Sequence, residues 1–194
     1  MNYAVIVFSY LIGAFPSAYL AGRWLKGVDI RRIGDTNPGA ANVGRNISHL
    51  AGLAVLAVDA AKGTMVVLVS QAFASQTMVL TCGVAVIAGH NFPVFFRFKG
   101  GRGLATAIGV LIALLPLEMA IMIAVCAIPF FKTGNLLLAG AILFVPLPFL
   151  EWWMGVPFRV IVYSLALPVS AGIMHLITTR KLSPEEKRAA RYMW

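Results

Sequence analysis

The sequence predicts an all-α integral membrane protein with about seven transmembrane helices, the N-terminus outside and the C-terminus cytoplasmic. Its 194 residues have a mean hydropathy of +0.85, and 60% of them are hydrophobic while only 12% are charged. So little polar surface cannot cover the core of a soluble protein. Apolar runs recur along the whole chain, and the loops between them are alternately rich and poor in Lys and Arg. We therefore expect one transmembrane domain over residues 1–194.

Seven apolar runs follow one another, and each is expected to be a helix. They cover residues 3–21, 48–72, 77–90, 104–117, 119–131, 135–150 and 158–179. The first run has no basic region before it and no small-residue cleavage site, so we expect it to remain as the first span. Some runs are shorter than the roughly 20 residues of a perpendicular span, which favours tilted, kinked or incomplete helices. Pro116 and Glu118 mark either a tight hairpin or a kink, so five or six spans are the alternative.

The loops differ in positive charge, and this difference predicts the orientation. With seven spans, the loops after the first, third, fifth and seventh helices share one face, which holds fourteen of the sixteen Lys and Arg residues. Arg159 lies at the opposite end and Lys62 within a helix. Because cytoplasmic loops are enriched in Lys and Arg, we expect this face to be cytoplasmic. The fourteen residues are Arg23, Lys26, Arg31, Arg32, Arg45, Arg97, Lys99, Arg102, Lys132, Arg180, Lys181, Lys187, Arg188 and Arg191.

The composition also limits the partners and cofactors. We expect no nucleic-acid partner, because the chain has no basic face interleaved with aromatic residues on a soluble module. The lipid bilayer, with its anionic headgroups, and phosphorylated substrates suit the net charge of +9 better. Cys82 and Cys126 lie inside apolar runs and are expected to be core residues. The sequence has no carboxylate cluster for a two-metal site, and we expect neither a metal nor a cofactor.

The polar segment 89–106 is the clearest candidate site. It holds Gly100, Gly101, Arg102 and Gly103 directly before the apolar run that starts near Leu104. Backbone N–H groups, a helix dipole and nearby cations at such a place suit a bound phosphate. An interfacial aromatic belt with cationic anchors would account for the Phe residues and the charges of this segment, but not for its glycines.

A second polar segment, residues 31–45, is expected on the same face. Small residues, the amides of Asn37 and Asn42, and Arg45 make it able to approach a ligand rich in oxygen atoms. A loop that merely follows the positive-inside rule, with ordinary Asn and Gly turns, is the equally weighted alternative.

Four ionisable residues inside the apolar runs complete the set of candidates. His90 and His175 lie at the inner ends of helices, where a histidine caps the helix or handles protons. Asp59 and Lys62 are three residues apart on one helix face, which predicts a structural ion pair or support for the floor of an active site. The sequence has no Gly-x-Ser-x-Gly elbow and no Cys beside a His to act as a nucleophile.

In this order and at these spacings, the polar segments resemble the PlsY family of bacterial acyl-phosphate:glycerol-3-phosphate acyltransferases. The resemblance runs through residues 13–20, 31–45, 59–63 and 89–106 to His175. It implies seven helices around a cytoplasm-facing site in the bacterial inner membrane. It also implies transfer of a fatty acyl group from acyl phosphate to the 1-hydroxyl of glycerol 3-phosphate, giving lysophosphatidic acid and phosphate in phospholipid synthesis.

The resemblance assigns roles to individual residues. Acyl phosphate is already activated, so the enzyme must mainly position an alcohol and stabilise the departing phosphate, without a covalent acyl-enzyme. The base is His90, His175 or an oxygen of the donor phosphate, and Asp35 and Lys99 complete the catalytic candidates. Thr106 belongs to the substrate-binding candidates. The donor phosphate is assigned to Lys99, Gly100, Gly101, Arg102 and Gly103, and the acceptor phosphate to Arg45, Asn37, Asn42 and His175.

The chain departs from the family's usual pattern at several of these positions. Asp35 stands where a hydroxyl residue is usual, and its carboxylate would repel a phosphorylated acceptor unless it is paired or protonated. Arg102 replaces a Lys, Thr178 replaces an Asn, and Ala41 replaces a Thr. These differences leave three alternatives open: a family member with another acceptor, a transporter of an anionic metabolite or lipid, and an inactive scaffold.

Overall fold

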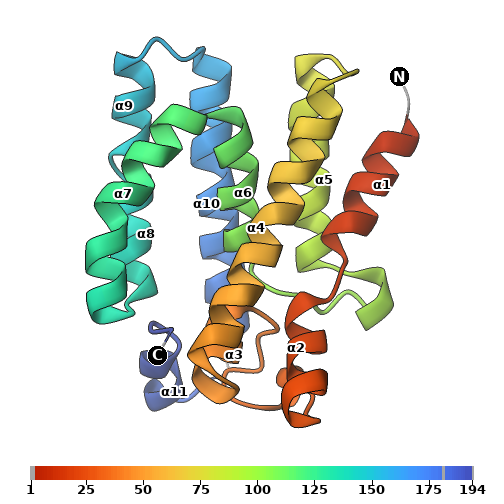
Figure 1. Ribbon diagram of the computed structural model, residues 1–194, viewed down its shortest axis with the longest axis vertical. Helices are drawn as coiled ribbons and strands as arrows, with labels where there is room; N and C mark the ends of the chain where they lie inside the picture. Colours follow the sequence, from red (N-terminus) through yellow and green to blue (C-terminus); the bar gives the residue numbers. More distant parts are fainter. Residues whose placement is uncertain (1–2, 181, 194) are drawn as a thin grey trace.

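The helices of the computed structural model run along one common axis and form a bundle (Figure 1). The structure describes residues 3–180 and 182–193, so the cation predicted at Lys181 lies outside the described residues. The all-α prediction is confirmed. The helices are α1 Tyr3–Gly13, α2 Ser17–Lys26, η1 Ile30–Arg32, α3 Ala40–Asn46, α4 His49–Gln71, α5 Gln76–Asn91, η2 Val94–Phe96, α6 Leu104–Leu114, α7 Pro116–Thr133, α8 Leu136–Phe144, α9 Leu147–Trp153, α10 Phe158–Thr179 and α11 Pro184–Ala189.

Six segments of the described chain are long and apolar enough to cross a membrane. They are Tyr3–Lys26, His49–Gln71, Gln76–Phe96, Pro116–Thr133, Leu136–Trp153 and Phe158–Thr179. The remaining predicted span, the run 104–117, corresponds to α6, which has 11 residues. At a rise of 1.5 Å per residue it is about 16 Å long, roughly half the thickness of the hydrocarbon core. By length and composition the described residues therefore hold six candidate spans, one fewer than the seven expected and within the alternative of five or six.

Proline residues explain where the apolar runs are interrupted. The predicted run 3–21 is two helices, because Pro16 has no N–H and its ring disfavours a continuous helix through the residues before it. The predicted run 135–150 is likewise divided at Val145 and Pro146. At Leu115 the chain reverses, so α6 and α7 form the hairpin that was one of the two expectations, with Pro116 as the first residue of α7 (Figure 1).

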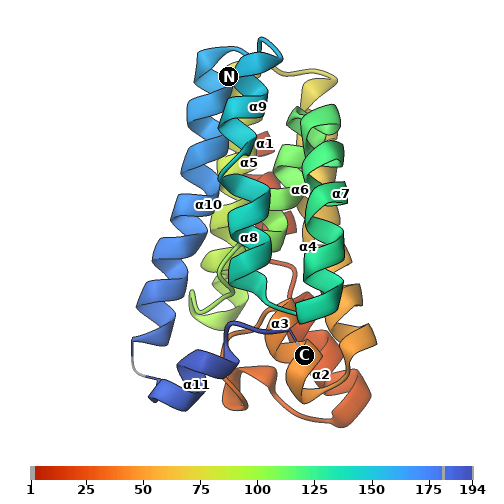
Figure 2. The same cartoon turned by 90° about the vertical axis from the view of Figure 1, so that its left-hand side faces the viewer.

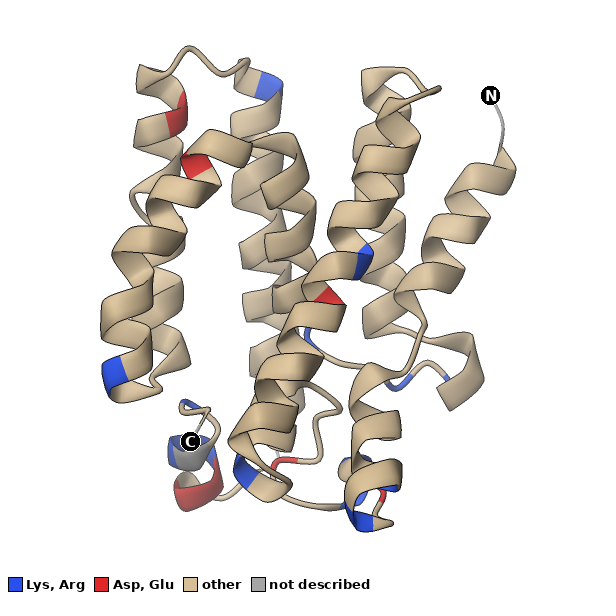
Figure 3. Cartoon of the chain, in the orientation of Figure 1, with Lys and Arg blue, Asp and Glu red and all other residues tan. Residues whose placement is uncertain are grey.

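The two ends of the bundle differ in charge. Helices α2, α3 and α11 lie together at one end in both views (Figures 1 and 2). Figure 3 shows most of the Lys and Arg residues at this end and few at the other, as the loop pattern predicts. We call it the basic end. Helix α1 begins at the opposite end, where Arg159 donates a hydrogen bond to Gln76.

Glycine lets two helix pairs approach closely around the site. A Cβ atom on Gly109 of α6 would lie 1.8 Å from the carbonyl oxygen of Ala60 on α4, and one on Gly89 of α5 would lie 1.9 Å from that of Tyr10 on α1. Small residues are typical of such contacts between membrane helices, because apolar side chains gain little from leaving lipid. Helices α4 and α6 are therefore held at a fixed spacing next to the polar segments.

Candidate active site

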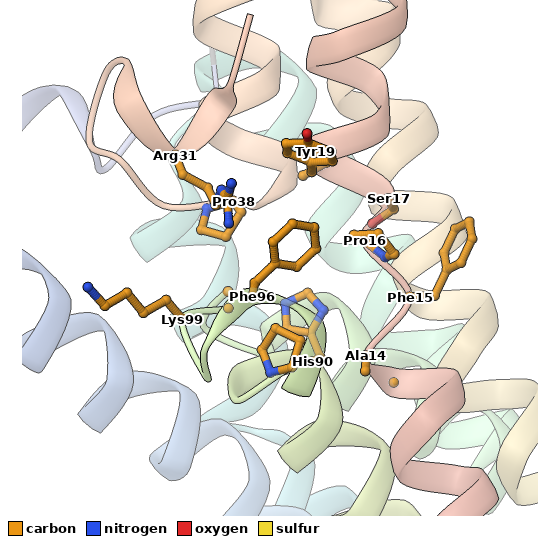
Figure 4. Close-up of a pocket in the computed structure, with 15 residues that line it drawn as sticks. Ala14, Phe15, Pro16, Ser17, Tyr19, Arg31, Pro38, His90, Phe96 and Lys99 are labelled. Atoms are coloured by element: carbon orange, nitrogen blue, oxygen red, sulfur yellow. The ribbon is translucent and has the colours of Figure 1, made fainter.

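A pocket lies where the first span is broken (Figure 4). The α1–α2 junction forms one wall, and the chain after α5 forms the opposite wall, with His90 and Phe96 between them in Figure 4. Arg31 and Pro38 close the side toward the basic end. The pocket thus joins the break in the first span with parts of the two predicted polar segments, residues 31–45 and 89–106.

Lys62 stabilises the break in the first span. Because α1 ends at Gly13, the carbonyl groups of Gly13 and Phe15 have no helical partners, and both accept hydrogen bonds from Lys62 Nζ at 3.2 and 3.0 Å. Within a membrane such carbonyl groups must be satisfied by the protein itself. Lys62 on α4 therefore donates to two carbonyl groups at the break, and that of Phe15 also accepts from the N–H group of Ser17 at 3.1 Å.

Lys62 also belongs to a group of four polar side chains beneath the pocket. Its Nζ lies 2.8 Å from Asp59 Oδ1 and 3.4 Å from His90 Nδ1. Ser17 donates a 2.5 Å hydrogen bond to the same Asp59 oxygen. The predicted Asp59–Lys62 pair is confirmed, and since Ser17 and His90 line the pocket, the pair also supports its floor.

The glycines after α5 fold this segment back onto the end of that helix. The N–H groups of Gly100 and Gly101 donate to the carbonyls of Asn91 and His90 at 3.0 and 3.1 Å. A Cβ atom on Gly101 would lie 2.3 Å from His90 Nε2, and Gly103 has a φ of +81°, which favours glycine. These two amides therefore serve the fold of the segment instead of lying open.

Open donors are found slightly further along the chain. Among the described residues, no backbone acceptor is paired with the N–H groups of Arg102 and Gly103, and the first turn of α6 adds the unpaired amides of a helix N-terminus. Thr106 Oγ1 in that turn is fully buried and also has no hydrogen-bond partner in the described chain. The open hydrogen-bonding groups of this segment are thus located at residues 102–106.

Asp35 joins the two arginines of the predicted site. Its Oδ2 accepts a 3.0 Å hydrogen bond from Arg102 Nη2 and lies 3.2 Å from Arg45 Nη2. Arg102 Nε donates to Thr178 Oγ1 on α10 at 3.0 Å. All four side chains are largely shielded, with 3% of Asp35, 14% of Arg45 and 11% of Arg102 exposed. We call Asp35, Arg45, Arg102 and Thr178 the arginine cluster.

The positive charge of Arg45 is only partly compensated within the arginine cluster. Burial lowers the pKa of the Arg45 guanidinium, nearby Asp35 opposes this effect, and the like charge of Arg102 adds to it. Although Asp35 is close, Arg45 Nη2 makes no hydrogen bond of good geometry to any described residue. A second anion beside Arg45 would therefore be attracted by its positive charge and could accept a hydrogen bond from Nη2.

The two predicted asparagines have different environments. Asn37 is buried, and its Oδ1 has no partner among the described residues, while its N–H faces Asp35 Oδ1 at 3.4 Å. Asn42 is fully buried, and its Nδ2 donates to the carbonyls of Ile30 and Ile33 at 3.1 and 3.0 Å. Asn37 thus offers an acceptor beside the cluster, whereas Asn42 holds the preceding loop together.

Lys99 and the two histidines also lie in separate places. Lys99 is exposed, and in Figure 4 its side chain extends away from the pocket. His90 is buried among Asp59 and Lys62. His175 is half-buried on α10 and lies three residues before Thr178, on the helix face that Arg102 approaches.

Residues that were not predicted to bind substrate also surround the site. The Arg31 guanidinium lies over two contacting rings, those of Tyr19 and Phe96, whose centroids are 5.0 and 4.3 Å from its Cζ. Its hydrogen bonds hold the pKa of Asp29 below the ordinary value. Asp29 two residues earlier is the local signal for this arrangement. The aromatic contacts join distant segments, so the sequence alone gives no sign of them.

The C-terminal tail, which belongs to the cationic segment expected on the same face, also contacts the site. Arg45 Nη1 donates to the carbonyl of Tyr192, and Met193 is fully buried. A Cβ atom on Gly44 would lie 2.7 Å from the carbonyl oxygen of Met193, so the tail packs closely on α3. The tail therefore holds Arg45 through a backbone carbonyl, in addition to the contact of Arg45 with Asp35.

Comparisons with known proteins agree on one family. The sequence model of the family described as glycerol-3-phosphate acyltransferase matches residues 3–184. Glycerol-3-phosphate acyltransferase 4 of Dehalococcoides mccartyi is 41% identical over 177 residues, covering 91% of this chain and 96% of that protein. The glycerol-3-phosphate acyltransferase of a Thermoanaerobacter species is 35% identical over 185 residues, covering 93% and 92%.

Solved structures give the same picture for the fold. The chain is similar to PlsY, an integral membrane glycerol 3-phosphate acyltransferase, in its glycerol 3-phosphate form, with a TM-score of 0.79 and 28% identity. The lysophosphatidic acid form of PlsY matches with a TM-score of 0.77. Both matches cover 92% of this chain and 90% of the other. A multi-pass membrane protein is therefore established for nearly the whole chain.

Proposed function

The chain belongs to the glycerol-3-phosphate acyltransferase family, and we propose that it transfers a fatty acyl group from acyl phosphate to the 1-hydroxyl of glycerol 3-phosphate. The products would be lysophosphatidic acid and inorganic phosphate. The observation that carries the proposal is the arginine cluster beside the glycine-rich segment. Two guanidinium groups, the open amides of residues 102–106 and the unpaired oxygen of Asn37 come together there, which suits two phosphate-bearing substrates.

The proposed reaction needs positioning more than activation. The hydroxyl oxygen of the acceptor attacks the acyl carbonyl, the bond between that carbon and the phosphate oxygen breaks, and the hydroxyl proton goes to the departing phosphate or to a base. Acyl phosphate supplies the leaving group, so no covalent intermediate on the enzyme is required. The contribution of the protein is to hold the two substrates in contact and to stabilise charge on the phosphate.

The geometry refines which residues we propose for each substrate. For the donor phosphate we propose the N–H groups at the start of α6 with Thr106, since the amides of Gly100 and Gly101 are already bonded. Lys99, which is exposed, would meet this phosphate only at the mouth of the site. For the acceptor phosphate we propose Arg45, with Asn37 accepting from a hydroxyl of the glycerol.

For proton transfer we propose His175 ahead of His90. His90 Nδ1 faces Lys62 and Asp59 within the buried group, and its Nε2 lies against Gly101. No side-chain hydrogen bond of His175 is found within the described ranges, and its helix face carries Thr178 of the arginine cluster. The test is His175→Gln against His90→Gln: the first should reduce kcat with little change in thermal stability, and the second should reduce stability as well.

The membrane position is a further part of the proposal. We propose that the basic end faces the cytoplasm of a bacterial inner membrane, because its loops carry most of the positive charge (Figure 3). In the variant Lys187→Cys, the introduced thiol should react with an impermeant maleimide only after cells are permeabilised.

For the acyl chain we propose an apolar groove between α1 and α4, which includes Val5, Ile12 and Val66. Ile12 of this groove directly precedes Gly13, which lines the pocket.

The activity can be measured directly with the detergent-purified protein. Palmitoyl phosphate and glycerol 3-phosphate should give inorganic phosphate and lysophosphatidic acid in equal amounts, and Arg45→Ala should abolish the transfer. Release of phosphate only with another alcohol would support a different acceptor, which the carboxylate of Asp35 between the arginines favours as the second candidate. Uptake of labelled glycerol 3-phosphate into proteoliposomes without acyl transfer would contradict the proposal.

A further inference from the structure

The arginine cluster contains its own anion. Asp35 Oδ2 lies 3.0 Å from Arg102 Nη2 and 3.2 Å from Arg45 Nη2, which is the position that an oxygen of a bound phosphate would take between two guanidinium groups. Arg102 is in turn fixed by its hydrogen bond to Thr178. The carboxylate and a ligand phosphate therefore compete for the same donors.

Two unsatisfied polar groups indicate that a ligand belongs at this place. Asn37 is 8% exposed, and its Oδ1 has no hydrogen-bond partner within the described chain. Arg45 Nη2 is buried and lacks a well-directed hydrogen bond despite its contact with Asp35. Buried polar atoms are nearly always satisfied in the working state of a protein. A polar ligand at Arg45 and Asn37 would give both of these atoms a hydrogen-bond partner.

We propose that Asp35 determines acceptor specificity by opposing the negative charge of the acceptor's phosphate at Arg45 and Arg102. The three side chains together carry one net positive charge, where a neutral residue at position 35 would leave two. A like charge about 5 Å from the phosphate weakens binding by more than tenfold at the effective dielectric of a partly buried site. The chain therefore binds a doubly charged phosphate monoester weakly and discriminates least against less charged acceptors. This inference rests on the proposed acyl transfer.

The decisive variants are Asp35→Ser and Asp35→Asn, with Glu185→Gln as the matched control. Glu185 is an exposed acid on α11 at the same basic end, so its substitution removes one negative charge without altering the arginine cluster. We expect both Asp35 variants to lower the KM for glycerol 3-phosphate at least tenfold, with kcat changed less than fivefold, and the control to change KM less than twofold. Inhibition by inorganic phosphate should tighten in parallel, because it uses the same donors.

Other outcomes would overturn the inference. A higher KM in both variants would mean that Asp35 contributes to acceptor binding, and a loss of kcat with unchanged KM would mean that it transfers a proton. Stabilisation by inorganic phosphate in thermal unfolding provides a readout without turnover, and it should be larger for Asp35→Asn than for the wild type. If this shift appears while no variant transfers an acyl group, the proposed function fails and the anion competition stands. If transfer occurs but neither KM nor the shift changes, only the inference fails.

Discussion

Replacing Lys62 by Met should destabilise the protein severely, because one buried cation serves three acceptors. Its Nζ bonds the carbonyls of Gly13 and Phe15 and pairs with Asp59 at 2.8 Å, and its side chain is 7% exposed. Removing one partner of a buried ion pair costs about 3–5 kcal/mol, since the other charge is left uncompensated. In a chain of this size each kcal/mol lowers Tm by about 2–4 °C. We therefore expect Tm to fall by about 6–20 °C.

The assay is thermal unfolding in one detergent, with two companion variants. In the double variant Asp59→Asn/Lys62→Met no unpaired charge remains, so at least half of the lost stability should return. Lys26→Met is the matched control, because Lys26 is exposed and, among the described residues, donates a side-chain hydrogen bond to the carbonyl of Asn46 alone, at 2.9 Å. Its cost should stay below about 1 kcal/mol. A Lys62→Met protein within 2 °C of the wild type, or a double variant as unstable as the single one, would refute the reasoning.

Two further predictions concern packing and pH. Gly109→Ala would put a Cβ 1.8 Å from the carbonyl oxygen of Ala60 and should cost about 1–3 kcal/mol or more, whereas Gly140→Ala meets nothing within 4 Å and should be neutral or slightly stabilising in the same unfolding assay. The pKa of Asp29 is lowered by Arg31, so the stability that this pair contributes is complete above the ordinary pKa of 3.8 and is lost as pH falls through the lower folded-state value. The Tm difference between wild type and Asp29→Asn should therefore shrink from about pH 5 to about pH 3, and a constant difference would contradict this origin.

The sequence predicts best those helices whose ends carry local signals. The runs 48–72 and 77–90 correspond to α4 and α5, where Ser48 and Ser75 accept hydrogen bonds from the backbone N–H groups of Ala51 and Met78. The first span is different. Pro16 marks its break, but the donors that make a broken helix tolerable in a membrane come from Lys62, far along the chain. A pattern of apolar residues contains no information about that contact.

The same limit explains which site residues could be predicted. Lys99 and Arg102 are both cations of one glycine-rich segment, yet Lys99 is exposed, while Arg102 is 11% exposed and is held by Thr178 on α10 and by Asp35 in a loop. The difference arises from Gly100 and Gly101, whose hydrogen bonds to the end of α5 turn the chain between the two cations. Residue type and spacing suggest phosphate binding for both, and only the fold separates them.

Three differences from the family's usual pattern, at Asp35, Arg102 and Thr178, contact one another in the structure. Considered singly, the carboxylate of Asp35, the guanidinium of Arg102 and the hydroxyl of Thr178 each weaken the resemblance to an active acyltransferase. In the structure Arg102 contacts both of the others, using Nη2 for Asp35 and Nε for Thr178. A lysine has one nitrogen and cannot offer two donors in this fixed geometry. Random loss of function would leave unpaired buried groups, whereas these three residues satisfy one another through the hydrogen bonds of Arg102.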